Sequence, residues 1–248
     1  MNKTALITGA SSGIGMATAK LLAKEGYRLI LAARREDILQ QLADDLSTEA
    51  MILKLDISDR AAVFAAIENL PNEWKNIDIL INNAGLASGM STIDKGDIDD
   101  WEIMIDTNIK GLLYITRAIL PNMVARGSGH IINIGSIAAK EAYTNGNVYC
   151  STKAAVDMLN KNMRIDLLPH PIKVTAIHPG AVETEFSIVR FHGDEERAKK
   201  VYEGFESLVG FDVAEAILFA VNRPPHVNIN ELTIMPTAQA VAGVIHRK

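Results

Sequence analysis

The sequence has little of what a secreted or membrane-spanning protein needs. Cys150 is the single cysteine among 248 residues, which excludes a disulfide within the chain and favours a reducing compartment. No apolar run approaches the roughly 18 residues of a membrane span. The apolar stretch after Lys3 reaches a glycine at Gly9, too early for the core of a signal peptide. We therefore expect a cytoplasmic protein that does not enter membranes.

An excess of positive charge is also missing. The formal net charge is −5, whereas nucleic acids and anionic membranes favour basic surfaces. The six histidines lack the His-x3-His or Glu-paired spacing that is typical of metal sites. We expect a small-molecule substrate, no nucleic-acid partner, no membrane partner and no metal.

What the sequence does contain is an alternation of apolar strands and helices. The strands are short and apolar on both faces, as in a parallel sheet that helices cover on both sides. Strands are predicted at 4–8, 28–33, 50–55, 78–82, 130–135, 172–177 and 231–235, and helices at 14–26, 36–46, 60–70, 98–125, 147–168 and 213–221. Pro121 is expected to bend or break the fourth helix. Alternating βα units predict an α/β fold, a doubly wound parallel sheet flanked by helices, in a single domain over 1–248.

A long connection near the end of the chain departs from this pattern. Residues 179–210 carry little strand or helix signal and include a charged stretch at 194–200. Long irregular connections in compact domains tend to be functional. We interpret this segment as a substrate loop with a short helix inside it.

A glycine-rich turn joins the first strand to the first helix. Its spacing, Gly-x3-Gly-x-Gly over Gly9, Gly13 and Gly15, differs from the main dinucleotide fingerprint. Its position matches that fingerprint, because it follows the first strand and opens a helix whose free N–H groups can bind phosphate. The alternative is a glycine-rich turn without a ligand. The predicted phosphate contacts are Gly9, Ser11, Ser12, Gly13, Ile14 and Gly15.

The end of the second strand indicates which nucleotide binds. The residue that contacts the adenosine ribose is expected about 20 residues after the turn. Arg34 and Arg35 stand there, and a guanidinium can hold a 2′-phosphate through paired hydrogen bonds. The alternative is that both arginines begin a solvated helix while Glu36 or Asp37 contacts the ribose. Those acids fit better as first-turn charges, so we predict NADP rather than NAD.

Five motifs in order resemble the short-chain dehydrogenase/reductase family. They are the glycine turn, Asn82-Asn83-Ala84-Gly85, Ser136, Tyr149-x3-Lys153 and Pro179-Gly180. The resemblance covers nearly the whole chain and implies a single Rossmann-like domain, a nicotinamide cofactor and a homotetramer or homodimer, of which we expect the homotetramer. Stretches 101–108, 184–191 and 226–230, with the ending around Met235-Pro236, resemble the NADP-dependent 3-hydroxy acid dehydrogenases, a subgroup that includes serine and L-allo-threonine dehydrogenases. The segment after Pro179-Gly180 departs from that subgroup by being about one residue shorter.

The candidate catalytic residues are Ser136, Tyr149, Lys153 and Asn108. Tyr149 would take the hydroxyl proton, although an unperturbed tyrosine has a pKa near 10. Lys153 lies four residues later on the same helix face, so its charge is expected to lower that pKa. Ser136 would hydrogen-bond the substrate oxygen. The resemblance further implies that Lys153 binds the nicotinamide ribose and that Asn108 holds a water leading from Lys153 to solvent.

Further cofactor contacts are expected at the carboxyl ends of the strands. Small residues after the fourth strand would let the adenosine ribose approach the backbone, and the end of the third strand would border the adenine. Residues after the sixth strand would bind the carboxamide. The candidates are Asp56, Ile57, Asn83, Ala84, Gly85, Pro179, Gly180, Val182 and Thr184, with Tyr149 and Lys153.

A 3-hydroxy acid also needs a cation for its carboxylate. Arg190 in the substrate loop can supply a bidentate contact, beside Ser136 and Tyr149 as the other substrate contacts. The alternative is an arginine on a solvated loop, and Lys140 is a weaker candidate. The sequence thus predicts an NADP-dependent oxidoreductase that acts on a small 3-hydroxy acid. The alternatives are an NADPH-dependent reductase of another carbonyl substrate, such as a 3-ketoacyl thioester or a general ketone, and a non-catalytic NADP-binding scaffold.

Overall fold

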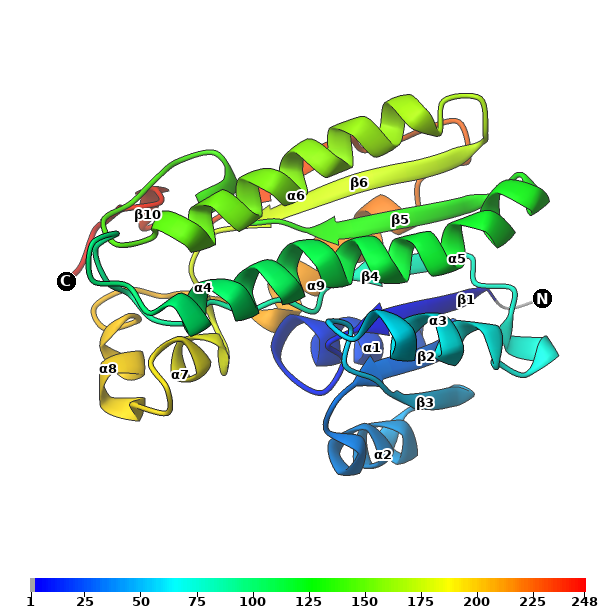
Figure 1. Cartoon of the computed structure of the whole chain (residues 1–248), viewed down its shortest axis with the longest axis horizontal. Helices are drawn as coiled ribbons and strands as arrows, with labels where there is room; N and C mark the ends of the chain where they lie inside the picture. Colours follow the sequence, from blue (N-terminus) through cyan, green and yellow to red (C-terminus); the bar gives the residue numbers. More distant parts are fainter. Residues whose placement is uncertain (1–2) are drawn as a thin grey trace.

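Seven parallel strands form the central sheet of the computed structural model, which describes residues 3–248 (Figure 1). The strand order is β3-β2-β1-β4-β5-β6-β9. The strands are β1 (Thr4–Thr8), β2 (Arg28–Ala33), β3 (Ala50–Lys54), β4 (Ile79–Asn82), β5 (Gly129–Ile134), β6 (Ile172–Pro179) and β9 (Glu231–Ile234). The main helices are α1 (Gly13–Lys24), α2 (Glu36–Asp45), α3 (Arg60–Glu68), α4 (Ile98–Ile105), α5 (Leu112–Arg126), α6 (Asn147–Asp166) and α9 (Gly210–Val221). The predicted doubly wound α/β sheet is confirmed.

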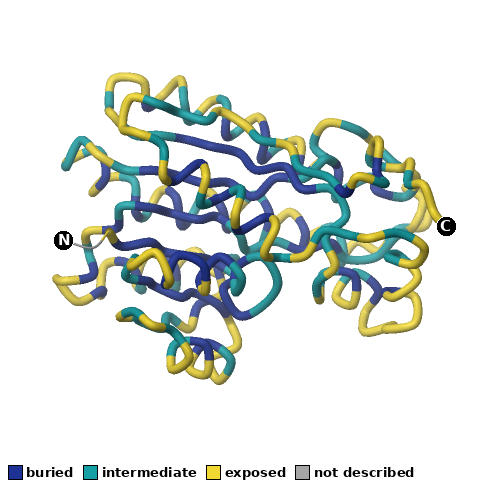
Figure 2. The backbone as a smooth tube through the Cα atoms, turned by 180° about the vertical axis from the view of Figure 1, so that it is seen from behind, coloured by how far each residue is buried: buried dark blue, intermediate teal, exposed yellow. Residues whose placement is uncertain are grey.

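Two apolar layers, one on each face of the sheet, explain why the strands are apolar throughout. In β1, Ile7 packs with residues of α1, α2 and α9, whereas Leu6 packs with residues of α3 and α5 on the other face. Both side chains are fully buried. Burying a side chain of this size contributes about 1.5–3 kcal/mol. Figure 2 shows the strands as the buried centre, with exposed segments at the helices and loops around them.

The prediction for residues 98–125 was wrong about Pro121. The helix α5 continues through Pro121, and the irregularity lies earlier, in a π-helical turn at η2 (Asp106–Gly111). A proline removes the hydrogen bond to the carbonyl four residues before it. Pro121 and Arg117 both lie on the exposed side of α5, so water can satisfy that carbonyl. The wider π turn instead carries Asn108 into the protein interior.

The segments after β6 hold more structure than the sequence predicted. In place of one short helix, residues 179–210 contain β7 (Val182–Glu183), α7 (Phe186–Arg190), α8 (Glu195–Lys200) and β8 (Leu208–Val209). After β9, predicted to be the last strand, an antiparallel hairpin of β10 (Gln239–Val241) and β11 (Val244–Ile245) follows. Figure 1 shows α7, α8 and β10 together at the end toward which β5 and β6 point.

The C-terminal residues pack on the substrate loop of their own chain. The Lys248 backbone N–H donates to the Gly204 carbonyl at 2.8 Å. The Arg247 guanidinium lies 5.1 Å from the centre of the Phe205 ring. The tail therefore forms part of the wall around the carboxyl end of the sheet.

A bilayer is crossed by helices of about 20 mostly apolar residues. Among residues 3–248, none of the helices is long and apolar enough to cross one.

Candidate active site

A cleft of about 840 Å³ opens at the carboxyl end of the sheet. It lies beside β1 and β4, where the strand order reverses, which is the usual ligand position in open α/β sheets. Its lining includes nearly all predicted site residues: Gly9, Ser11, Ser12, Gly13, Ile14, Arg34, Arg35, Asp56, Ile57, Asn83, Ala84, Gly85, Ser136, Tyr149, Lys153, Pro179, Gly180, Val182, Thr184 and Arg190. Gly15 and Asn108 lie behind this wall.

Close backbone approach explains the glycines of the turn. Gly9 has a φ of +65°, and a Cβ there would lie 2.9 Å from the Cα of Ala84. A Cβ on Gly15 would lie 2.3 Å from the carbonyl oxygen of Gly9. Side chains at either position would push the turn away from its neighbours, so the tight loop at the start of α1 depends on both glycines.

The N-terminus of α1 can accept an anion. Ser12 is the N-cap residue of α1, and within residues 3–248 its side chain accepts no hydrogen bond from the first turn. The first N–H groups of the helix are therefore available for phosphate oxygens. Arg35 lies at the same end of the cleft. Its Nη2 donates to the carbonyl of Ser11 at 3.2 Å and pairs with the Glu185 carboxylate at 2.9 Å. Free helix donors and a guanidinium together suit a dinucleotide with an extra phosphate.

Tyr149 and Ser136 meet at the centre of the cleft. Tyr149 stands in the first turn of α6, and Ser136 follows β5 as the cap of the short 3₁₀ helix η3 (Ile137–Ala139). The Ser136 hydroxyl oxygen accepts a hydrogen bond from the Ala138 N–H at 3.1 Å. Burial raises the pKa of Tyr149 to about 12, while the Arg190 charge and a hydrogen bond with Ser136 act in the opposite direction. At neutral pH Tyr149 is therefore a protonated phenol.

Lys153 is buried beside this pair and faces the end of β5. Its ammonium donates to the Ile134 carbonyl at 2.9 Å, and burial lowers its pKa to about 8. The sequence predicted that Lys153 would lower the pKa of Tyr149. In the structure the cation that lowers this pKa is Arg190. The reason is positional, because the guanidinium approaches the phenol ring while the ammonium is held at the β5 carbonyl.

Asn108 braces the loop after β4 from behind the cleft. Its Oδ1 accepts from the Leu86 N–H at 2.8 Å, and its Nδ2 donates to the Leu86 carbonyl at 2.8 Å and to the Thr152 hydroxyl at 3.0 Å. A Cβ on Gly85 would lie 3.1 Å from the Asn108 Oδ1 and 3.4 Å from the Lys153 Nζ. Asn108 is thus next to Lys153, and the water that it is expected to hold stays a prediction.

Arg190 lies against the reacting end of the cleft. Its guanidinium is 4.9 Å from the ring centre of Tyr149 and 5.0 Å from that of Phe186, and it donates to the Tyr143 hydroxyl at 2.9 Å. This position differs from that of an arginine on a solvated loop. The weaker candidate Lys140 was wrong, because its ammonium points away from the cleft to Asp157 at 2.9 Å and Glu231 at 2.8 Å.

Sequence reasoning missed many lining residues, among them Tyr143, Phe186 and Gln239. Tyr143 and Phe186 surround Arg190, and Gln239 accepts from the Ala181 N–H at 2.8 Å. Aromatic residues make up only 5% of the chain, so an aromatic six residues before Tyr149 was a usable signal. Gln239 offered no signal, because only the return of the C-terminal hairpin brings it to the cleft.

A doubly wound sheet with a glycine turn at a helix N-terminus, and with Tyr149, Ser136 and Lys153 in one cleft, is the arrangement expected of a nucleotide-dependent oxidoreductase. A family model described as short chain dehydrogenase matches residues 3–194. The chain belongs to this family and is an NADP-dependent oxidoreductase that acts on CH–OH groups.

Several relatives span the whole chain. The NADP-dependent 3-hydroxy acid dehydrogenase of Escherichia coli (strain K12) is 48% identical over 98% of this chain and 99% of its own. The enzyme of the same name in Schizosaccharomyces pombe is 45% identical over 99% of this chain and 97% of its own. The solved closed form of a serine dehydrogenase complexed with NADP⁺ superimposes with a TM-score of 0.95 at 48% identity, covering 99% of this chain and 100% of that one.

Proposed function

We propose that this protein oxidises the hydroxyl group of small 3-hydroxy acids with NADP⁺, or reduces the corresponding carbonyl with NADPH. The observation that carries the proposal is the position of Arg190. A guanidinium 4.9 Å from the Tyr149 ring can hold a carboxylate while the nearby hydroxyl faces the phenol. Relatives named for 3-hydroxy acids, at 45–48% identity over the full length, support the same substrate class.

The residues of the cleft fit NADP. The first N–H groups of α1 would bind the pyrophosphate, and Arg34 and Arg35 would bind the 2′-phosphate. Asp56 and Ile57 would border the adenine. Asn83, Ala84 and Gly85 would border the ribose, and Pro179, Gly180, Val182 and Thr184 would border the carboxamide. When bound, the nicotinamide accepts the hydride that leaves the substrate carbon.

Tyr149, Ser136 and Lys153 would manage the proton. Oxidation uses the tyrosinate form of Tyr149, whose own proton first leaves toward solvent; as the hydride leaves carbon, the hydroxyl proton then passes to the Tyr149 oxygen, and a carbonyl remains. The Ser136 hydroxyl would hydrogen-bond the substrate oxygen as its charge changes. Lys153 would bind the nicotinamide ribose and pass the proton toward a water beside Asn108. In the reverse direction Tyr149 gives its proton to the carbonyl oxygen, which suits a phenol whose pKa burial raises to about 12.

A substrate panel tests the proposal. Initial rates are measured with L-serine, L-allo-threonine and 3-hydroxypropionate, each with NADP⁺ and with NAD⁺. We expect turnover with NADP⁺ and a large preference over NAD⁺. Turnover of a 3-ketoacyl thioester or a neutral ketone, but of no hydroxy acid, would favour the alternative reductase. A 3-ketoacyl-ACP reductase from Sinorhizobium meliloti 1021 shares the fold at a TM-score of 0.82 and 30% identity over 93% of this chain and 96% of its own. Tight NADPH binding without any turnover would indicate the non-catalytic scaffold.

We also propose a homotetramer in the cytoplasm. Exposed apolar side chains on three helices support the assembly: Ile103 of α4, Leu113 of α5, and Met158 and Ile165 of α6. Monomeric proteins seldom expose such side chains in groups. Light scattering on the purified protein should give four times the 27.0 kDa of one chain. A mass of one chain would contradict the assembly and leave the chemistry untouched.

A further inference from the structure

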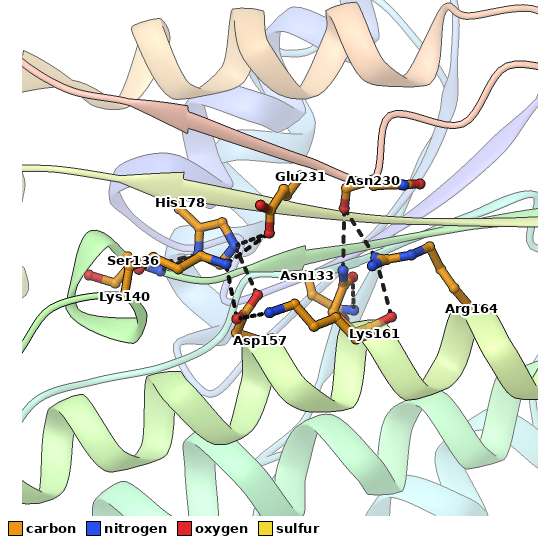
Figure 3. Close-up of polar contacts among 10 residues, drawn as sticks. Asn133, Ser136, Lys140, Asp157, Lys161, Arg164, His178, Asn230 and Glu231 are labelled. Carbon is orange, nitrogen blue, oxygen red and sulfur yellow. Dashed lines mark hydrogen bonds and ion pairs between the residues drawn. The ribbon is translucent and has the colours of Figure 1, made fainter.

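A polar cluster with a buried centre, Asp157 and His178, lies next to Ser136 and outside the lining of the cleft (Figure 3). We call it the Asp157 cluster; its members are Lys140, Asp157, Lys161, His178 and Glu231. They come from the end of η3, from α6, from β6 and from β9. Burial of ionisable side chains is costly unless they are paired, so this arrangement calls for an explanation that packing does not supply.

Asp157 is the centre of the cluster. Its Oδ2 accepts from the ammonium groups of Lys140 and Lys161, each at 2.9 Å. Its Oδ1 faces the Nε2 of His178 at 3.4 Å. Lys153, Asp157 and Lys161 succeed one another at four-residue intervals on α6, so the helix face that carries the active-site lysine continues into the cluster.

The ring of His178 packs directly on the backbone at Ser136. Its Nδ1 lies 3.3 Å from the Ser136 N–H nitrogen and 3.2 Å from the Ser136 carbonyl oxygen. A Cβ on Gly135 would lie only 2.4 Å from this Nδ1. The ring itself is fully buried, at 0% exposed. The backbone of Ser136 therefore has a histidine nitrogen as its immediate neighbour.

The groups around Nε2 favour one tautomer, because Nδ1 lies about equally near the N–H nitrogen and the carbonyl oxygen of Ser136 and suits either. The Nε2 faces the Asp157 carboxylate at 3.4 Å and the Glu231 carboxylate at 4.0 Å, and both are acceptors. A proton on Nε2 gives this nitrogen a donor role, whereas a bare Nε2 would place lone pairs against carboxylate oxygens. Burial and the charge of Lys140 lower the pKa of His178, so the ring is neutral near pH 7. A neutral ring with its proton on Nε2 has a free acceptor at Nδ1, which faces the Ser136 N–H.

The same cluster holds the other end of the Ser136 turn. Lys140 follows η3, and its ammonium bridges Asp157 at 2.9 Å and Glu231 at 2.8 Å. Asp157 thus binds Lys140 directly and contacts the backbone of Ser136 through His178. The Ser136 side chain lines the cleft on the other side of that turn, where it acts to lower the pKa of Tyr149.

The charges argue against a metal at this place. One ligand atom each of Asp157, His178 and Glu231 lies within 4.8 Å of the others, as a metal site would require. The ammonium groups of Lys140 and Lys161 already balance the two carboxylates. A divalent cation would have to displace or face two positive charges, so ion pairing accounts for the acids.

We propose that Asp157 and His178 form a positioning pair for Ser136, in which His178 donates from Nε2 to Asp157 and accepts the Ser136 N–H at Nδ1. The pair touches no reacting atom and acts through Ser136. The effect of the pair on the rate rests on the proposed function, whereas the tautomer of His178 is independent of that function.

The tautomer is measured by ¹⁵N NMR of the full-length protein labelled in its histidines. The six histidines give separate ring signals, and the signal lost in His178→Gln identifies the residue. We expect a neutral ring protonated on Nε2 in the wild type near pH 7. In Asp157→Asn the amide can donate to Nε2, so we expect the proton on Nδ1. A wild-type proton on Nδ1, or an unchanged tautomer in Asp157→Asn, would overturn the pair. So would a His178 signal that shifts on addition of one equivalent of Zn²⁺, which would indicate a metal site.

Kinetics separate positioning from packing. In His178→Leu we expect kcat to fall about tenfold, the effect of one lost hydrogen bond, with the KM for NADP⁺ unchanged. His178→Gln keeps an acceptor and a donor, so it should stay within about twofold of the wild type. Asp157→Asn should resemble His178→Leu, and Asp166→Asn, at the exposed end of α6, is the matched control. Equal losses in the Leu and Gln variants, or none in either, would contradict the proposal. If the wild type oxidises no hydroxy acid, the proposed function fails and the NMR result still decides the pair.

Discussion

Replacing Arg190 with Met removes the cation beside Tyr149 and keeps much of the side-chain length. The guanidinium now lies 4.9 Å from the Tyr149 ring and donates to the Tyr143 hydroxyl at 2.9 Å. In the proposed complex it would instead hold the substrate carboxylate. The variant should therefore discriminate between a charged substrate and a neutral one of the same shape.

The size of the effect follows from the bond that is lost. A hydrogen bond to a charged group contributes about 1.5–3 kcal/mol, which corresponds to about 10- to 150-fold in kcat/KM. In the reduction direction Tyr149 must be protonated, and its pKa of about 12 keeps it so at neutral pH. Removing Arg190 raises that pKa further, so reduction of a neutral ketone should change by less than about threefold.

Acetoacetate and its methyl ester form a matched pair for the assay, because the ester removes the carboxylate charge and adds only one methyl group. We expect NADPH oxidation with acetoacetate to lose about 10- to 150-fold in kcat/KM in Arg190→Met, while the ester is nearly unaffected. Arg197→Met, at an exposed site on α8 of the same loop, is the control and should behave as the wild type. Equal losses on both substrates would refute the assignment of the carboxylate to Arg190.

Two further predictions concern the cofactor and the core. Arg35→Ser should weaken NADP⁺ binding about 10- to 100-fold without affecting NAD⁺ binding. Glu185→Gln removes the competing carboxylate 2.9 Å from Arg35 and should tighten NADP⁺ binding up to about fivefold. Calorimetry with both nucleotides measures these affinities, and an equal loss for NADP⁺ and NAD⁺ in Arg35→Ser would contradict the assignment. Burial lowers the pKa of His130 to about 3 in the folded protein, so the unfolded chain takes the proton first and stability falls as pH drops from about 6.5 toward 3. Relative to His130→Gln, the wild type should lose about 1.4 kcal/mol of unfolding free energy per pH unit in that window. Unfolding free energies from urea titrations that change equally with pH in the two proteins would contradict this.

The sequence was informative wherever one local pattern determined the structure. Strands apolar on both faces predicted a covered parallel sheet, and Leu6 and Ile7 do pack in opposite layers. The glycine turn predicted the start of α1, because glycine adopts the φ of +65° at Gly9 without strain and leaves room for the backbone of Ala84. The order of the motifs brought Ser136, Tyr149 and Lys153 to one cleft.

The misses arose where distant segments meet. Gln239 reaches the cleft through a hairpin whose strands are short, three residues in β10 and two in β11, and give little pattern. Asp157 and His178 stand on different elements, and each alone is an ordinary polar residue in the sequence. The charge beside Tyr149 was assigned to the nearest cation on its helix, Lys153, whereas a loop 41 residues downstream supplies it through Arg190. Because charges act through space, distance along the sequence was a poor guide to which cation lies nearest the Tyr149 ring.

The most direct test of the proposed chemistry is Tyr149→Phe, which removes one oxygen atom from the centre of the cleft. Turnover of the preferred hydroxy acid with NADP⁺ is compared with NADPH binding, measured separately by fluorescence. We predict a loss of about 10²- to 10⁴-fold in kcat with NADPH binding nearly unchanged, and a much smaller loss in Tyr143→Phe. A Tyr149→Phe variant that retains wild-type turnover would contradict the assignment of proton transfer to this residue.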